Sequence, residues 1–327
     1  TKWGLTSLGI GAIIGGGIFT LTGIAAHDYA GPALALSFVI AGIGCLFASL
    51  CYAEFASVLP VEGSAYAYAY GTVGELFAWF IGWNLILEYM MGATTVAVAW
   101  SGYFVKLLHL FGIDFPIWLC NDLTTATEKY AELGQGAPSF AFNLPAFLIT
   151  WIVTYILVKG IKEAAKTNNI IVIIKVAVVL FVIIAGAFYI DTANWQPFIP
   201  AETTVMIDGV EKVSFGFGGV LTAATIVFFA YIGFDAVSTQ AGEAINPKKD
   251  VPFAIVASLI ICTVLYILVS LVLTGMVPYD QLDKSAPVAS AFSENGITWA
   301  VFIITLAATA GLTSVMLVMM LGQTRIF

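Results

Sequence analysis

Two interruptions inside long apolar segments carry the groups of this chain that could bind a ligand. The first is the triplet Gly15, Gly16 and Gly17, and the second lies around Gly233 in residues 228–235. Glycine is about 1 kcal/mol less favourable than alanine inside a helix, so three in succession favour local unwinding. If these segments cross a membrane, the freed N–H and C=O groups find no partner in hydrocarbon and must face something polar.

An unwound helix presents two half-helix ends to the gap between them. One end carries a partial positive charge of about half a unit and free N–H groups, which suit a carboxylate. The other end offers carbonyl oxygens to an ammonium group, so the pair fits an α-amino acid. Two broken membrane helices are also typical of secondary transporters. Single glycines such as Gly9 and Gly11 are better explained by close helix packing.

The composition is that of an integral membrane protein. Of the 327 residues, 60% are hydrophobic and 10% are charged, against about 25% charged in soluble domains. Lys and Arg are sparse and scattered, which argues against nucleic-acid binding. His27 and His109 lie far apart and the four cysteines show no CxxC spacing, so we expect neither a catalytic nor a metal site. No phosphate-binding glycine motif occurs, so we expect no cofactor.

A membrane-crossing helix needs about 20 apolar residues, and we expect eight such spans. They cover residues 4–26, 33–59, 75–109, 143–159, 168–190, 214–241, 251–276 and 299–321. The breaks fall in the first and sixth spans. Because the distance of five spans is odd, a second five-span unit would insert upside down, as in the inverted repeats of transporters. We expect one transmembrane domain over 1–327, with a first repeat at 1–190 and part of a second at 214–327.

The distribution of Lys and Arg predicts the orientation. If the N-terminus is inside, the inner segments hold Lys2, Lys159, Lys162, Lys166, Lys248, Lys249 and Arg325, and the outer ones hold Lys106, Lys129, Lys212 and Lys284. We therefore expect a multi-pass protein of the cell (plasma) membrane with a cytoplasmic N-terminus. The chain stops directly after the eighth span without a polar tail, which favours a longer protein.

Five motifs together resemble the amino acid–polyamine–organocation superfamily, and within it the cationic amino acid transporter family with its bacterial members. They lie at residues 11–19, 60–70, 82–89, 228–235 and 243–252. The resemblance implies an all-α integral membrane protein with the leucine-transporter-type fold, in which five plus five helices form inverted repeats and the first and sixth are broken. It implies twelve spans, of which about eight are present here.

The resemblance also assigns the two ends of an amino acid substrate. Its carboxylate is expected on the amides of Gly15, Gly16 and Gly17, with Ile14 in the same break. Its ammonium is expected on carbonyl oxygens in both breaks, those of Ile13, Phe229, Ala230 and Ile232. Gly233 completes the second break, and Phe229 or Tyr231 is expected to act as a lid.

Lys175 lies about seven residues into the fifth span, or about 10 Å along the helix axis. From the residues alone, a lysine that snorkels to the interface and a functional lysine are both open. In proton-coupled members of the resembling family, a lysine of the fifth helix occupies the place of a sodium ion. Its ammonium would bond to the broken first helix and to hydroxyls of the eighth span, for which Thr313 and Ser314 are candidates. Because burial favours the neutral amine, Lys175 is the expected proton-coupling residue.

Glu88 in the third span and Asp235 just after the second break are the intramembrane acids. Such acids pair with polar groups or take part in transport. Two interpretations stay open for both residues: structural pairing with Lys175 or with the backbone, and direct handling of a proton or the substrate.

Met319 is expected to face the substrate side chain, although Met316, Met319 and Met320 could all be core filler. If this sequence is aligned with the resembling family on Arg325, Met319 falls where vertebrate cationic transporters carry serine. A thioether at that position favours substrates with smaller, neutral side chains. We expect a secondary active, proton-coupled symporter of small neutral (alanine-like) or broad L-amino acids that works by alternating access. A cationic amino acid transporter or exchanger and a non-transporting sensor are the alternatives, and a protein partner stays open.

Overall fold

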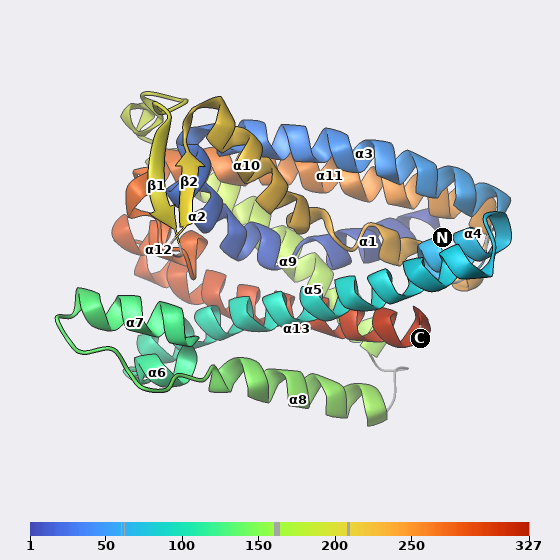
Figure 1. Cartoon of the computed structure of the whole chain (residues 1–327), viewed down its shortest axis with the longest axis horizontal. Coiled ribbons are helices and arrows are strands. Elements are labelled where there is room, and N and C mark those ends of the chain that lie inside the picture. The colour runs from blue at the N-terminus through green and yellow to red at the C-terminus, as the bar shows by residue number, and fades with distance from the viewer. Residues whose placement is uncertain (60, 62, 160–163, 208–209, 327) are drawn as a thin grey trace.

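The computed structural model describes residues 1–59, 61, 63–159, 164–207 and 210–326. Three residues used above lie outside these ranges. Pro60 and Glu62 belong to the motif at residues 60–70, and Lys162 is one of the lysines used to predict the orientation. The described chain is a bundle of roughly parallel and antiparallel helices with one β-hairpin (Figure 1). The hairpin, α6, α7 and α12 gather at one end of the bundle, and both termini lie at the other end (Figure 1).

The long helices run along the bundle. They are α1 (Lys2–Ile13), α3 (Leu34–Val58), α5 (Glu75–Leu110), α8 (Leu144–Lys159), α9 (Ala164–Gly186), α10 (Gly216–Phe228), α11 (Pro247–Met276) and α13 (Thr298–Ile326). The shorter helices are α2 (Thr22–Ala25), α4 (Ser64–Thr72), α6 (Ile117–Cys120), α7 (Leu123–Glu132) and α12 (Pro287–Glu294). The hairpin strands β1 (Thr203–Ile207) and β2 (Val210–Ser214) are antiparallel, with Thr203 opposite Ser214.

Six helical segments among the described residues are long and apolar enough to cross a membrane. They are Gly17–Val58, Glu75–Leu110, Ile171–Tyr189, Gly216–Thr239, Pro247–Met276 and Thr298–Thr324. The fourth expected span is α8, a shorter apolar helix of 16 residues. The first expected span is divided, because α1 ends at Ile13 and helix resumes only at Gly17. The prediction of an all-α membrane protein with a broken first helix is therefore confirmed.

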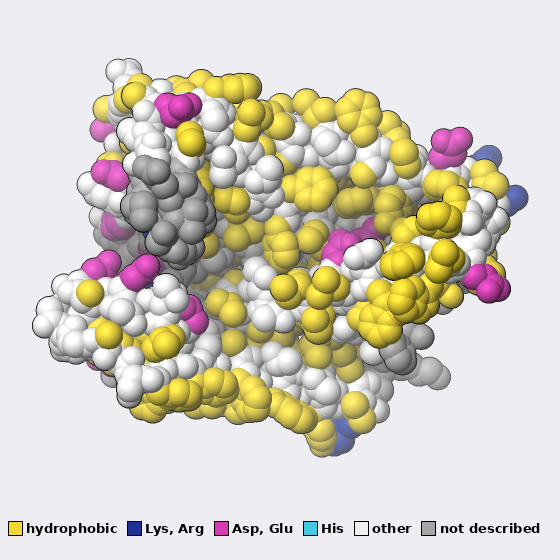
Figure 2. All heavy atoms as spheres, viewed as in Figure 1, with side chains coloured by type: hydrophobic (Ala, Val, Ile, Leu, Met, Phe, Trp, Pro, Cys, Tyr) yellow, Lys and Arg dark blue, Asp and Glu magenta, His cyan; other side chains and the backbone are white. Residues whose placement is uncertain are grey.

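The broken helices lie in the middle of the bundle. In Figure 1, α3 and α11 cover them on one side, and α5 and α13 lie on the other. α8 lies at the edge, against α5 and α13. Large apolar side chains are exposed along the flanks of the bundle, as lipid contact requires (Figure 2).

Buried tyrosines bond the broken helices to their neighbours. The Tyr103 hydroxyl of α5 donates to the carbonyl oxygen of Phe19 at 2.6 Å. The Tyr231 hydroxyl donates to the carbonyl oxygen of Phe38 in α3 at 2.9 Å. A buried hydroxyl without a partner would cost about 1–3 kcal/mol, so each of these bonds favours one relative placement of two helices.

Candidate functional site

The first break occupies the residues between α1 and the π-helical turn Gly17–Leu21. Ile14 is extended, with φ −71° and ψ 100°. Among the described residues, no hydrogen-bond acceptor lies against the N–H of Gly15 or of Gly16. Gly17 has no room for a side chain, because a Cβ there would overlap the Cα and Cβ of Ala230. The triplet thus gives both free amides and a close approach to the second break.

The second break begins where α10 ends at Phe228. A 3₁₀ turn follows at Phe229–Tyr231, Ile232 is extended with ψ 133°, and Gly233 has φ +111°. That positive φ favours glycine. A Cβ at Gly233 would also lie 3.0 Å from the carbonyl carbon and oxygen of Ala12. The two breaks therefore contact each other through backbone.

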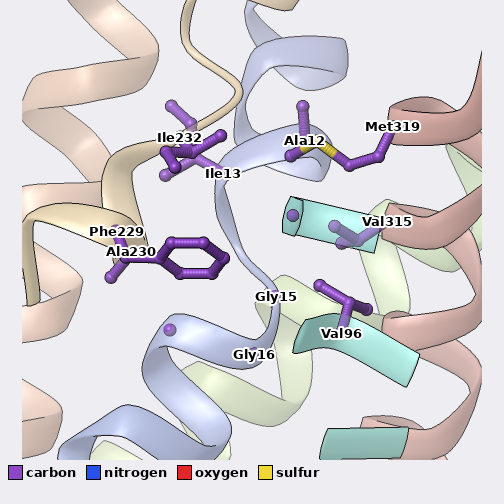
Figure 3. A pocket seen from close by; sticks show the side chains of 12 residues that line it. Ala12, Ile13, Gly15, Gly16, Val96, Phe229, Ala230, Ile232, Val315 and Met319 are labelled. Carbon is purple, nitrogen blue, oxygen red and sulfur yellow. The ribbon is translucent and has the colours of Figure 1, made fainter. Parts of the chain in front are cut away.

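Both breaks line one narrow cavity (Figure 3). Eight of the residues predicted to bind substrate lie around it: Ile13, Gly15, Gly16, Gly17, Phe229, Ala230, Ile232 and Met319. The Phe229 ring points from the second break toward the Gly15–Gly16 segment (Figure 3). The free space is about 10 Å³, roughly the room for one water molecule. An amino acid can enter only if lining side chains move.

Three other predicted residues lie beside the cavity and do not line it. Ile14 is fully buried, and its carbonyl oxygen faces Lys175. Tyr231 points toward α3, where it bonds to Phe38, so of the two lid candidates only Phe229 faces the cavity. Gly233 contacts the backbone of Ala12 behind it.

Sequence reasoning missed the wall that α5 and α13 contribute. Gly92 and Val96 of α5 and Val315 of α13 line the cavity with Met319. Figure 3 shows Val96 and Val315 near Met319. A Cβ at Gly92 would lie 3.5 Å from the Met319 sulfur, so the small residue leaves space for the thioether. Nothing in the local sequence marks these positions, because they become neighbours only when α5 packs along α13. No charged side chain of the described residues lines this cavity.

Tyr266 of α11 is a second residue that sequence reasoning missed. Its hydroxyl lies 2.7 Å from the carbonyl oxygen of Ile13 and 3.0 Å from that of Ala230. One hydroxyl has one proton to donate, so it bonds to one carbonyl at a time and holds both within reach. Two carbonyls that were expected to bind a substrate ammonium are therefore next to Tyr266. The only sign of Tyr266 in the sequence is that a tyrosine stands in the middle of an apolar span.

Lys175 is fully buried on α9 and bonds to the first break. Its ammonium donates to the carbonyl oxygens of Gly11 at 2.5 Å and Ile14 at 3.0 Å. Its stem packs on Gly311 of α13, where a Cβ would lie 2.6 Å from the lysine Cδ. A lysine that snorkels would place its ammonium at the interface, whereas this one points to the middle of the bundle.

The two hydroxyls predicted for Lys175 lie on different sides of α13. Ser314 is buried three residues after Gly311 and so shares the face that contacts the lysine stem. Thr313 faces α5 instead. Its hydroxyl accepts a hydrogen bond from the Trp100 indole at 2.9 Å and donates to the carbonyl oxygen of Thr309 at 2.9 Å.

The intramembrane acids form a separate polar cluster next to the second break. The buried Asp235 accepts hydrogen bonds from the Tyr89 hydroxyl at 2.7 Å and the Ser64 hydroxyl at 3.1 Å. Glu88 is half-buried and precedes Tyr89 on α5. Within the described part of the chain, Lys175 bonds to backbone carbonyls and Asp235 to hydroxyls.

The comparisons with known proteins agree with this architecture. Residues 1–327 match the amino acid permease family. The branched-chain amino acid permease BcaP of Bacillus subtilis is 49% identical over 324 residues, which cover 98% of this chain and 64% of the relative. The methylthioribose transporter of the same organism is 45% identical over 322 residues, which cover 98% and 64%.

Plant relatives are also similar. The chloroplastic cationic amino acid transporter 9 of Arabidopsis thaliana is 41% identical over 327 residues, which cover 99% of this chain and 53% of the relative. The chain thus spans between about half and two thirds of the length of these relatives. Their names describe transporters and not enzymes. The resemblance inferred from the motifs is confirmed: the chain belongs to the amino acid permease family of the amino acid–polyamine–organocation superfamily and is a multi-pass membrane protein.

Proposed function

We propose that this chain forms the substrate-binding core of a secondary active L-amino acid transporter. One observation carries the proposal: the two breaks face the same cavity, and the amides of Gly15 and Gly16 have no partner among the described residues. The substrate carboxylate would accept hydrogen bonds from these amides at the start of the second half of the helix. Its ammonium would donate to carbonyl oxygens of the second break, such as that of Ile232.

The lining favours a substrate with a neutral, apolar side chain. Val96, Val315 and Met319 form the wall opposite Phe229 (Figure 3). A cationic side chain would find no counter-charge there and would lose its hydration. The name of the branched-chain permease supports this class. We therefore place small neutral to branched-chain L-amino acids before arginine and lysine.

The narrow cavity supports alternating access. Because the free space holds about one water molecule, substrate binding requires Phe229 or Met319 to swing away. The Phe229 ring would return over the bound substrate as a lid. Such closing and reopening toward either side is how broken-helix transporters work.

Lys175 is the proposed proton-coupling residue. As an ammonium it holds the carbonyl oxygens of Gly11 and Ile14, the turn that leads into the free amides. As a neutral amine it would hold them less strongly, because charge-assisted hydrogen bonds are about twice as strong as neutral ones. Loss of the proton would thus loosen the first break.

We place this transporter in the plasma membrane with its N-terminus in the cytoplasm, as the charge distribution predicts.

The test uses the full-length protein in liposomes. Uptake of labelled L-alanine, L-leucine and L-arginine is measured under an imposed proton gradient and, separately, under a sodium gradient. We expect proton-driven accumulation of alanine and leucine and at most weak uptake of arginine. Unlabelled methylthioribose is added as a competitor, because one relative carries that substrate in its name.

Three outcomes contradict parts of the proposal. Absence of uptake together with absence of counterflow indicates a sensor and not a transporter. Accumulation under sodium alone removes the role given to Lys175. Strong competition by methylthioribose with no amino acid uptake shows that the site binds another class of compound.

A further inference from the structure

The end of the bundle where α1 and α11 begin presents unpaired lysines beside exposed aromatic rings. Lys2 and Trp3 begin α1, and Lys248 and Lys249 lie in the first turn of α11. All three lysines are exposed. Among the described residues none of them makes an ion pair. The first turn of α11 holds a single acid, Asp250, against the two lysines Lys248 and Lys249.

Aromatic rings join the two helix ends. Trp3 of α1 packs edge-to-face on Phe253 of α11, with ring centroids 5.4 Å apart at 85°. The Lys2 ammonium lies 5.0 Å from the centre of the Phe253 ring. Lys249 precedes Phe253 by one helical turn on the same face of α11. Lys2 of α1 therefore lies against the Phe253 ring of α11, and Lys249 lies one turn before that ring on α11.

The cluster lies next to the lipid-facing surface of α11. Ile260 and Val264 continue the face of Phe253 along α11, and each is 50% exposed. Exposed apolar side chains on a membrane-crossing helix face lipid, so the aromatic pair lies where that surface ends. Tryptophan at such a depth sits among lipid headgroups, and lysine side chains reach from there to headgroup phosphates.

We propose that Lys2, Lys248 and Lys249, together with Trp3 and Phe253, bind the headgroup of an anionic phospholipid that bridges α1 and α11. The phosphate lies between the ammonium groups, and the acyl chains run along the face of Phe253, Ile260 and Val264. A free phosphate would use the lysines alone, whereas a phospholipid uses the lysines, the rings and the apolar face together.

The bridge has a consequence for transport, and this part rests on the proposed function. α1 packs closely on α11, since a Cβ at Gly9 would lie 2.6 Å from the Ser258 hydroxyl oxygen. The same helix presents Gly11 to Lys175 and Ile13 to Tyr266. To open the site at this end, α1 must separate from α11. A lipid that binds both helix ends therefore slows that opening.

Lipid binding is tested on the full-length protein in a neutral detergent, without any transport measurement. Dioleoyl-phosphatidylglycerol, dioleoyl-phosphatidylcholine or inorganic phosphate is added, and the melting temperature is recorded. The variant carries Lys2→Gln, Lys248→Gln and Lys249→Gln together. The control is Lys129→Gln in α7, at the opposite end of the bundle.

We expect phosphatidylglycerol to raise the melting temperature of the wild type and the control, with a much smaller rise in the triple variant. Each lysine removed should weaken binding about fivefold, the equivalent of about 1 kcal/mol for each charge at the surface. Native mass spectrometry should show the loss of a retained phosphatidylglycerol in the triple variant. If that variant folds poorly, three Lys→Arg changes should restore both folding and binding.

Two results overturn the proposal. An equal effect of phosphatidylglycerol on the wild type and the triple variant places the lipid elsewhere. If inorganic phosphate raises the melting temperature of the wild type as much as phosphatidylglycerol does, the cluster is an anion site that does not need lipid. Because neither measurement involves an amino acid, their failure is distinct from a failure of the proposed transport function, which the uptake assay reports.

Discussion

The Lys175 ammonium donates to the carbonyl oxygen of Ile14, the last residue before the glycine triplet, at 3.0 Å. It also bonds to Gly11, one turn earlier. The buried charge on α9 is thus connected to the free amides of Gly15 and Gly16 through a single stretch of backbone. A change of charge on Lys175 and a change of geometry at the cavity are therefore parts of one structural unit.

Lys175→Ala should strongly lower proton-driven accumulation of alanine or leucine in liposomes. The change leaves the carbonyl oxygens of Gly11 and Ile14 without their donor, which at about 1–3 kcal/mol lowers accumulation about tenfold or more. Counterflow at equal pH should persist at a lower rate, because every side chain that lines the cavity is still present. Lys129→Ala on α7 is the control. Uptake by Lys175→Ala that still follows the proton gradient would remove the coupling role.

Gly17→Ala should abolish uptake and lower the melting temperature. A Cβ at Gly17 overlaps Ala230, and overpacking of this kind costs about 1–3 kcal/mol. The matched control is Gly44→Ala in α3, where a Cβ would have nothing within 4 Å.

Gly16→Val should also abolish uptake with normal membrane insertion, because the larger side chain fills the space beside the free amides. Normal transport by both variants contradicts the site.

Met319→Ser should admit larger substrates. Removal of the thioether widens the wall beside Gly92, and each methylene of pocket space is worth about 1–3 kcal/mol in discrimination between substrates. Competition by leucine and arginine against labelled alanine measures the gain. Met316→Ser is the control, since Met316 is buried in the same helix and does not line the cavity. An unchanged substrate range would show that Met319 is core filler.

Tyr266→Phe should raise KM for alanine and destabilise the protein by about 1–3 kcal/mol, because the carbonyls of Ile13 and Ala230 lose their buried donor. Tyr231→Phe removes a similar bond to Phe38 away from the cavity. We expect this control to lose stability while KM stays the same. If both variants change KM equally, Tyr266 has no special effect on the substrate site.

Asp283→Asn should change transport by the same factor at pH 5.5 and at pH 7.5. Burial raises the pKa of Asp283, but the charge of Lys106 and the amides of Ala286 and Ser285 outweigh it, so the pKa lies below its ordinary value of 3.8. The stability that an acid with a lowered pKa contributes is complete at pH values above its ordinary pKa, and it is lost only as the pH falls through its pKa in the folded protein. Both pH 5.5 and pH 7.5 lie above that range. This partly exposed pair contributes about 1 kcal/mol or less. An effect of Asp283→Asn that differs between the two pH values would contradict the lowered pKa of Asp283.

The two breaks could be predicted from the sequence because their cause is local. Three successive glycines disfavour helix in any surroundings, and Gly233 adopts a positive φ that other residues rarely take. Long apolar stretches likewise indicate membrane helices without any tertiary information. The broken first helix and the all-α membrane fold were correct on these grounds.

The tertiary structure decided which side chains meet at the cavity. Gly92, Val96 and Val315 line it, Tyr266 reaches both breaks, and Thr313 turns toward Trp100. These placements depend on how α5, α11 and α13 are rotated about their axes. In a membrane all faces of such helices are apolar, so hydrophobic periodicity does not distinguish the buried face from the lipid-facing one. The sequence by itself determined the breaks and the chemistry of their backbone, whereas helix packing determined the wall that faces the substrate side chain.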